Sequence, residues 1–286
     1  MCGASGRKRG LPLAEKIQDL LQNAILDILD YDINTRREMD SRNRDFPFYV
    51  MSYVKRGEAC LRVGGQVYRT GPGSIIIVPP HTLHDHYKET SGETEFLWWH
   101  FHFRIFGVVD AIRILRLPLV SRLSAQDRFE QLFRRYWEAM HGPKTLPNLL
   151  RSRAFGLDVM ALILEELISG RSIETNLNIP EAFLGIFWEI SEPGPEKISL
   201  NYLSEKYHMS PAYISNRFKK FFGVAPIEMR REIVFRQAKL LLRTGSRSIG
   251  DIARSLGFEN VFDFTRAFTK KEGVSPTAYR RTHRTF

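Results

Sequence analysis

The C-terminal part of the chain contains the same residue pattern twice, at residues 199–226 and 248–276. This repeat limits the fold more than any other feature of the sequence. After one inserted residue in the second copy, Leu200, Leu203, Tyr207, Ile214, Phe218, Gly223 and Pro226 correspond to Ile249, Ile252, Leu256, Phe264, Phe268, Gly273 and Pro276. The spacing predicts a short helix, a tight turn and a second helix in each copy. We therefore expect two helix-turn-helix motifs.

The second helix of each copy, called here the reading helix, has one apolar face. Ile214, Phe218 and Phe221 are spaced to face a core, and so are Phe264 and Phe268. The opposite faces carry Ala212, Ser215, Asn216 and Lys219 in the first copy and Phe262, Thr265, Arg266 and Thr269 in the second. Small, amide, hydroxyl and guanidinium groups on a protruding helix are suited to contacting base edges in DNA.

Polar residues indicate where these helices begin. Ser210 followed by Pro211 suits an N-cap and the first helical position. Asn260 is a candidate N-cap for the second reading helix, and Ser248 with Asp251 resembles a capping box. The sequence thus predicts the helix starts from local chemistry as well as from periodicity.

Between the two copies, residues 227–243 predict a linker helix, which ends at Thr244 and Gly245. Its apolar stripe consists of Met229, Ile233, Ala238, Leu241 and Leu242. About 16 residues at about 1.5 Å each give a helix of roughly 24 Å. Such a helix would hold the two reading helices about one DNA turn (~34 Å) apart, so that one chain contacts two successive major grooves.

Basic charge is concentrated in the same region. Residues 211–286 contain sixteen Lys and Arg residues and six Asp and Glu residues, a surplus of ten that equals the net charge of +10 of the whole chain. The rest of the chain is therefore balanced. A basic surface that only keeps a protein in solution is the alternative, but its coincidence with the two repeats favours contact with DNA phosphates.

Residues 181–281 resemble the DNA-binding domain of the AraC/XylS family of bacterial transcription regulators. The resemblance rests on A-K-L-L-L-R-T in the linker helix, I-x-x-I-A-x-x-x-G-F at 249–258 and F-T-R-A-F-T-K-K-x-G-V-S-P-x-x-Y-R at 264–280. It implies that the residues contacting bases are Ala212, Ser215, Asn216, Val261, Phe262, Thr265 and Arg266. We expect the phosphate contacts from Lys219, Lys220, Lys270, Lys271, Arg280 and Arg281.

One residue of the second reading helix departs from the family pattern. Position 263 is Asp, where the family more often has an aromatic residue or His. A carboxylate faces phosphate poorly, so Asp263 is expected to cap its own helix instead. This makes the second reading helix the less certain contact surface.

Length and composition indicate two domains and an α+β multidomain protein. A chain of 286 residues with 43% hydrophobic residues exceeds one typical domain. The two cysteines, Cys2 and Cys60, give neither a disulfide framework nor a CxxC metal site, as expected in a reducing cytosol. We find no signal-peptide core and no apolar run of the roughly 20 residues that a membrane span needs. The sequence predicts a bacterial cytoplasmic protein without a cofactor.

The N-terminal half alternates between helical and strand patterns. We expect a helix at 13–30, short strands with Gly and Pro turns from 46 to 104, and helices at 127–141 and 149–169. The strands favour a small antiparallel barrel or sandwich. The predicted organisation is an N-terminal extension with a helix (1–45), a β-barrel domain with helices (46–170), a linker (171–180) and an all-α domain of two helix-turn-helix motifs (181–286).

The strand region resembles the cupin-like effector domain of many AraC-type regulators. The similarity covers about 60 residues, includes G-P-G-S-I-I-I-V-P-P-H-T-L-H-D-H and W-W-H-F, and rests on Pro79, His84, Trp98, His100 and Phe101. It implies a small-molecule site and a barrel of cupin type. On the strand at 95–103, Phe96, Trp98, His100 and His102 share one mixed face, while the other face is wholly apolar.

Five of the eight histidines lie in this region: His81, His84, His86, His100 and His102. A cupin metal site is one interpretation, but Val78 stands where such enzymes usually have Gly, and Glu89 comes one residue early. We predict no metal and place His84, Trp98, His100 and His102 in an effector pocket. An ordinary barrel core with hydrogen-bonded histidines is the alternative.

These observations predict a regulator that binds double-stranded promoter DNA and is not an enzyme. Its N-terminal domain would bind a small molecule, a carbohydrate or a derivative, because aromatic faces with polar edges suit sugars. Residues 127–140 and 154–168 each have a broad apolar face; we expect that one covers the barrel and that the remaining apolar surface forms a homodimer, the alternative being that both only pack on the barrel. RNA polymerase is an expected partner if the protein activates. The alternatives are a metal-dependent cupin enzyme fused to a DNA-binding domain and a DNA binder that responds to no ligand.

Overall fold

The computed structural model describes residues 22, 24–115, 117–168, 179–192, 194 and 198–283. These residues form two compact units, one made of the described residues of 13–105 and 110–178, the other of residues 106–109 and the described residues from 179 onward. The N-terminal unit is rich in strands and the C-terminal unit is helical, as the sequence predicts. No helix in the described ranges is long and apolar enough to cross a membrane. We call the N-terminal unit the β-rich unit and the C-terminal unit the helical unit.

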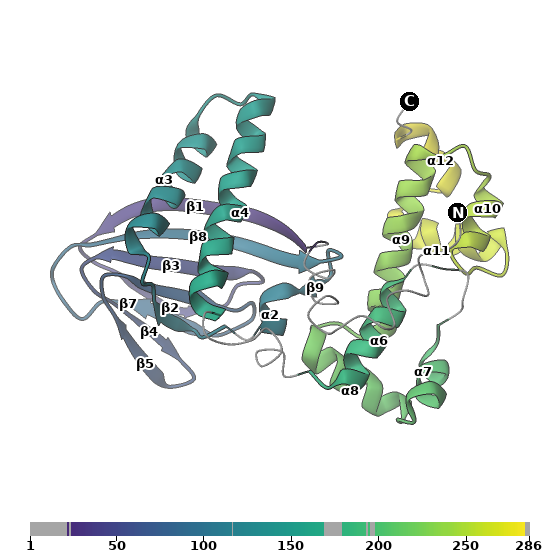
Figure 1. Ribbon diagram of the computed structural model, residues 1–286, viewed down its shortest axis with the longest axis horizontal. Helices are drawn as coiled ribbons and strands as arrows, with labels where there is room; N and C mark the ends of the chain where they lie inside the picture. Colours follow the sequence, from purple (N-terminus) through teal and green to yellow (C-terminus); the bar gives the residue numbers. More distant parts are fainter. Residues whose placement is uncertain are drawn as a thin grey trace. The chain divides into compact units, whose positions relative to one another are not determined.

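The β-rich unit contains two antiparallel sheets (Figure 1). The larger sheet has the strand order β1-β8-β3-β6-β10, with β9 paired to β8, and the smaller has the order β2-β7-β4-β5. The strands are β1 (Ala24–Arg36), β2 (Asp40–Arg44), β3 (Tyr49–Arg56), β4 (Ala59–Val63), β5 (Gln66–Thr70), β6 (Ser74–Val78), β7 (His84–Tyr87), β8 (Thr94–Ile105), β9 (Val109–Asp110) and β10 (Val120–Arg122). The segment at 46–104 that the sequence predicts as strands contains β3, β4, β5, β6, β7 and most of β8.

The two faces of strand β8, which belongs to the larger sheet, lie in different surroundings. Its odd-numbered residues from Leu97 to Ile105 are buried, and its even-numbered residues from Trp98 to Arg104 are half-buried. The buried face lies under helices, since the ring of Trp99 packs 6.1 Å from Phe133 and 5.8 Å from Tyr136. The predicted alternation is therefore confirmed, and it leaves the mixed face directed away from the helices.

The helices of this unit are α2 (Ala111–Leu115), α3 (Gln126–His141) and α4 (Leu146–Ile168). Figure 1 shows α3 and α4 side by side against the larger sheet. Phe129, Phe133 and Tyr136 of α3 face the sheet and are fully buried. The predicted helices at 127–141 and 149–169 correspond to α3 and α4.

The predicted helix at 13–30 is wrong where the structure describes it. Residues 24–36 form strand β1, which pairs with β8 from Ala24↔Ile105 to Arg36↔Thr94. The pairing with a long partner strand outweighs the helical spacing of the apolar residues, and Asp27, Asp30 and Asp32 are weak helix formers. Residues 13–21 of the prediction lie outside the described ranges. Strands β1 and β2 belong to the two sheets, so residues 24–44 are part of the β-rich unit and not a separate extension.

The helical unit consists of α6 (Glu181–Ser191), α7 (Leu200–Tyr207), α8 (Pro211–Phe222), α9 (Pro226–Thr244), α10 (Ile249–Ser255), α11 (Val261–Glu272) and α12 (Pro276–His283). The predicted linker helix is α9, and the reading helices are α8 and α11. In Figure 1, α9 runs from the group of α6, α7 and α8 to the group of α10, α11 and α12. Each copy of the sequence repeat is thus a helix-turn-helix motif packed on the same central helix.

Each motif has its own aromatic core. In the first, the ring centroids of Phe218 and Phe222 are 4.3 Å apart, and those of Phe222 and Phe187 of α6 are 4.8 Å apart. In the second, Phe264 packs 5.6 Å from Phe268 within a cluster that includes residues of α9 and α10. Burial of these rings ties the first reading helix to α6 and the second to α9 and α10.

The predicted helix starts are confirmed. The side chain of Ser210 accepts a hydrogen bond from the backbone N–H of Tyr213, and Pro211 occupies the first turn. Asn260 caps α11 by accepting from Asp263 N–H, and Ser248 caps α10 by accepting from Asp251 N–H. These caps satisfy backbone donors that a helix leaves unpaired.

Candidate functional site

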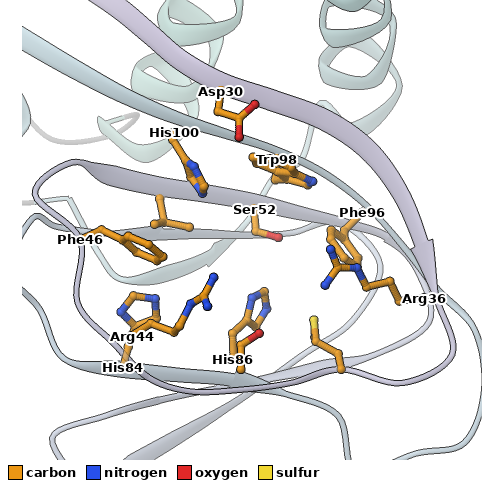
Figure 2. A pocket seen from close by; sticks show the side chains of 13 residues that line it. Asp30, Arg36, Arg44, Phe46, Ser52, His84, His86, Phe96, Trp98 and His100 are labelled. Atoms are coloured by element: carbon orange, nitrogen blue, oxygen red, sulfur yellow. The ribbon is translucent and has the colours of Figure 1, made fainter.

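A cavity of about 290 Å³ lies between the two sheets of the β-rich unit (Figure 2). Strands β3 and β8 line it from the larger sheet, and β2 and β7 line it from the smaller one. The residues around it are Asp30, Arg36, Met39, Ser41, Arg44, Phe46, Val50, Ser52, His84, His86, Phe96, Trp98 and His100. Three of the four residues predicted for an effector pocket, His84, Trp98 and His100, are therefore brought together.

Aromatic rings form one side of the cavity. Trp98 and His100 are neighbours on the mixed face of β8, with ring centroids 4.8 Å apart. The ring of Phe46 lies 5.6 Å from that of His100 and 6.1 Å from that of His84. The resulting surface offers flat faces on which the ring of a small molecule can stack.

Two polar groups of this wall already have partners. The indole N–H of Trp98 donates to Oδ1 of Asn34 at 2.8 Å. Nδ1 of His84 lies 2.8 Å from the carbonyl oxygen of Thr82. Because a carbonyl oxygen only accepts, Nδ1 carries the proton and Nε2 of His84 is left as an acceptor. Trp98 thus supplies a stacking face and His84 supplies a hydrogen-bond acceptor.

Two other polar groups at the cavity have no hydrogen-bond partner within the described part of the chain: Oγ of Ser52 and Nε2 of His86. Ser52 is 2% exposed and pairs with Trp98 across strands β3 and β8. A buried polar atom without a partner costs free energy, and such atoms are typical of sites that a ligand completes. These two groups are available to hydroxyl groups of a bound molecule.

Two histidines at the cavity, His86 and His100, favour the neutral form. Burial, together with the neighbouring His84 and Arg36, lowers the pKa of His86 to about 4. Burial also lowers the pKa of His100, and Arg44 adds to this effect while Asp30 opposes it. Neutral imidazoles both donate and accept, so these side chains can orient a polar ligand without adding positive charge.

His102 does not line the cavity. It lies two residues further along the same face of β8, and Nη2 of Arg104 is 3.0 Å from its Nδ1. Conversely, Arg36, Arg44 and Phe46 do line it. Sequence reasoning missed these three because they lie on or beside β1 and β2, whose pairing has no local signal. Within the described ranges, no group of three or more His, Cys, Asp or Glu residues is arranged to hold a metal ion.

In the helical unit, the predicted base-contacting residues lie on α8 and α11. Ala212 and Asn216 are exposed and Ser215 is half-buried. On α11, Phe262 is 81% exposed and Arg266 is exposed, whereas Val261 and Thr265 are half-buried.

Asp263 makes two contacts on the second reading helix. Its Oδ2 accepts from Nδ2 of Asn260 at 2.9 Å, so it takes part in capping α11, as the sequence predicts. Its Oδ1 accepts from Nη2 of Arg266 at 2.9 Å. The guanidinium of Arg266 is therefore restrained by an acidic neighbour on the same helix.

The predicted phosphate-contacting residues differ in their surroundings. Lys219, Lys220, Lys270 and Arg281 are exposed. Lys271 forms an ion pair with Glu232, and Nη2 of Arg280 donates to the carbonyl oxygen of Arg247 at 2.7 Å. Contact of Lys271 or Arg280 with DNA would therefore compete with a contact inside the protein.

The β-rich unit with a cavity between its sheets and the helical unit with two helix-turn-helix motifs together define a ligand-binding transcription regulator. A family model described as an AraC-like ligand binding domain matches residues 34–156, and one described as a helix-turn-helix domain matches residues 203–282. The chain belongs to the AraC/XylS family of transcription regulators.

Relatives resemble the chain over most of its length. The arabinose operon regulatory protein of Salmonella typhimurium is 25% identical over 81% of this chain and 83% of that protein. The HTH-type transcriptional regulator YisR of Bacillus subtilis is 24% identical over 83% of this chain and 87% of that protein. Among solved structures, the chain is similar to the C-terminal domain of AraT from Geobacillus stearothermophilus, with 27% identity and a TM-score of 0.36. The match covers 38% of this chain and 91% of the AraT domain.

Proposed function

We propose that the regulator is controlled by a carbohydrate effector that binds in the cavity between the two sheets. The observation that carries this proposal is the combination of the Trp98 face with the unpartnered Ser52 Oγ and His86 Nε2. A sugar offers an apolar ring face and several hydroxyl groups, which this surface matches. The resemblance to the arabinose operon regulatory protein of Salmonella typhimurium supports a carbohydrate.

A thermal-shift screen of monosaccharides on the full chain tests this proposal. A ligand of the folded state raises the melting temperature by mass action. The variant Trp98→Ala should lose the shift and the effect of the sugar on DNA affinity, while it binds DNA in the absence of sugar as the wild type does. A folded Trp98→Ala variant that responds to the same sugar concentrations would contradict the proposal.

We further propose that α8 and α11 contact base edges in two successive major grooves of promoter DNA. Ala212, Ser215 and Asn216 would read bases from α8, and Val261, Phe262, Thr265 and Arg266 from α11. Lys219, Lys220, Lys270 and Arg281 would contact phosphates, because their side chains are exposed. DNA affinity of the full chain should therefore fall steeply with rising salt, and an affinity indifferent to salt would contradict these phosphate contacts.

We infer that the protein acts as a homodimer through the first half of α4. Phe129, Phe133 and Tyr136 of α3 are buried against the sheet, so α3 contributes little apolar surplus. The leucines left exposed on α4 are Leu146, Leu149, Leu150 and Leu157. They recur at helical spacing and form one stripe, as in a two-fold helix interface.

Sedimentation of the full chain tests this interface. The wild type should sediment as a dimer at micromolar concentration, and Leu150→Glu should sediment as a monomer. Leu240→Glu, in the helical unit, is a matched control because Leu240 is 52% exposed. A monomeric wild type would indicate that α4 only covers the sheet. If the dimer activates transcription, RNA polymerase is the further partner.

A further inference from the structure

Two arginines direct their guanidinium groups into the cavity. Arg36 is the last residue of β1 and Arg44 is the last residue of β2. Figure 2 shows both guanidinium groups directed toward the space between His86 and Trp98. In the described part of the chain, neither side chain has an ion-pair partner or donates a hydrogen bond. Two permanent cations therefore border the cavity without an acidic partner among the residues that the structure describes.

The neighbouring arginines behave differently. Arg37 donates from Nε to Oε1 of Glu93 at 2.9 Å. Arg42 forms ion pairs with Asp40 and, at 3.6 Å, with Asp85. Arginines of this segment thus pair with carboxylates where they face away from the cavity, and the lack of a partner is specific to the two that line it.

Aromatic rings hold the two guanidinium groups in place. Cζ of Arg44 lies 5.0 Å from the centroid of the Phe46 ring, and Cζ of Arg36 lies 5.8 Å from that of Phe96. Cation–π contacts at these distances restrict a guanidinium group but satisfy none of its N–H donors. The planar, five-donor groups are therefore oriented and still able to bind an anion.

The single carboxylate at the cavity does not neutralise them. Asp30 forms no ion pair with Arg36 or Arg44, and its Oδ1 accepts the backbone N–H of Tyr31 at 3.0 Å. In Figure 2, Asp30 lies beside His100 and Trp98, across the cavity from Arg44. The cavity is therefore polarised, with two cations on one side and one acid on the other.

We propose that the effector is an acidic monosaccharide whose anionic group is bound by Arg36 and Arg44. This inference rests on the proposed carbohydrate effector and adds its charge. Carboxylate and phosphate both accept paired N–H donors from guanidinium groups. The sugar ring would lie on Trp98, with hydroxyl groups donating to or accepting from Ser52 Oγ and His86 Nε2. Arg36 and Arg44 are exposed, so water solvates their N–H donors when no anion is bound, and an uncharged sugar would gain no ion pair with them.

Calorimetric titration of the full chain with sugars that differ only at one carbon tests the proposal. The probes are glucose, glucuronate and glucose 6-phosphate, with galactose and galacturonate as a second series. We expect at least one acidic sugar to bind about tenfold or more tightly than its neutral parent, the range of one hydrogen bond to a charged group. Comparison of the affinities for glucuronate and glucose 6-phosphate shows whether the site prefers a carboxylate or a phosphate.

Variants assign this preference to the two arginines. Arg44→Gln and Arg36→Gln should each reduce the ratio of acidic to neutral affinity about tenfold, and Arg37→Gln should leave it unchanged. If Arg44→Gln fails to fold, Arg36→Gln carries the test. Neutral sugars that bind as tightly as the acids, or a ratio that survives both variants, would overturn the acidic effector and leave the carbohydrate proposal standing. No binding by any sugar would overturn both.

Discussion

The two helix-turn-helix motifs share one buried ring position but differ elsewhere, because buried Ile214 and Phe222 of α8 correspond to Phe264 and Glu272 of α11. Phe218 and Phe268 occupy matching positions and are both fully buried. On the reading faces, α8 carries small and amide side chains, whereas α11 carries the 81% exposed Phe262 and an Arg266 paired with Asp263. The turns differ as well, because the left-handed residue is His208 in the first motif and Gly257 in the second.

This difference separates what the fold requires from what recognition requires. At the matched position of Phe218 and Phe268, both copies keep a buried ring that packs against neighbouring aromatic rings. Exposed positions are free to diverge, and they have diverged toward different donor and acceptor groups. Phe218 and Phe268 are therefore expected to have the same structural role, and the two reading helices are expected to make different contacts with DNA.

The largest effect should come from the matched core positions. Phe218→Ala and Phe268→Ala should each lower the free energy of unfolding by about 3–5 kcal/mol, because each leaves a cavity where a buried ring was packed. Urea unfolding followed by far-ultraviolet circular dichroism measures both losses. A loss in one motif more than twice that in the other would show that the two rings do not have the same structural role.

The next effect concerns DNA binding, and the two motifs should differ in the base positions at which a substitution relaxes selectivity. Asn216→Ala and Arg266→Ala should each cost about 1–3 kcal/mol at the preferred DNA sequence and relax selectivity at different bases. Lys219→Ala is the matched control, since a phosphate contact should weaken all sequences alike. If Arg266→Ala weakens preferred and random DNA equally, Arg266 contacts phosphate and not a base.

A smaller effect is expected in the turns. Gly257 has φ of 84°, so Gly257→Ala should cost about 1–2 kcal/mol of stability, because an L side chain is strained in the left-handed region. His208 already tolerates φ of 53°, and His208→Gly should change stability by less than about 1 kcal/mol. Thermal unfolding of both variants checks this order, and a greater change at His208 would contradict it.

The smallest effect should follow Asp263→Asn, which keeps the shape of the side chain and weakens its pairing with Arg266. Exposed pairs of this kind contribute about 0.3–0.5 kcal/mol, so stability should change little. Base selectivity should change more than stability, because the guanidinium of Arg266 loses its restraint. Unaltered selectivity in a binding assay on randomised DNA would show that Asp263 only caps the helix.

The sequence predicted the helical unit well because its signals are local. Caps such as Ser210 and Asn260, and apolar spacing such as that of Phe264 and Phe268, depend on residues within one or two helical turns. The reading helices therefore matched α8 and α11 in position, and their predicted core residues Ile214, Phe218, Phe264 and Phe268 are buried. The contacts of Lys271 with Glu232 and of Arg280 with Arg247 join distant segments, and no local pattern indicated them.

The cavity was predicted only in part because its walls are built by strand pairing. The alternation along residues 95–103 predicted that Trp98 and His100 share one face of the strand, and both line the cavity. Arg36 and Arg44 were missed because β1 has apolar residues at helical spacing and β2 is a short polar strand, D-S-R-N-R. Their positions follow from pairing with β8 and β7, which the sequence does not specify locally.

The central claim is that both motifs of one chain contact DNA, each in its own major groove. Hydroxyl-radical footprinting with residues 181–286 on a selected binding site measures this directly. We expect two protected patches about one helical turn (~10 bp) apart on one face of the duplex, with Asn216→Ala weakening one patch and Arg266→Ala the other. A single patch that responds to both variants, or to neither, would contradict the account.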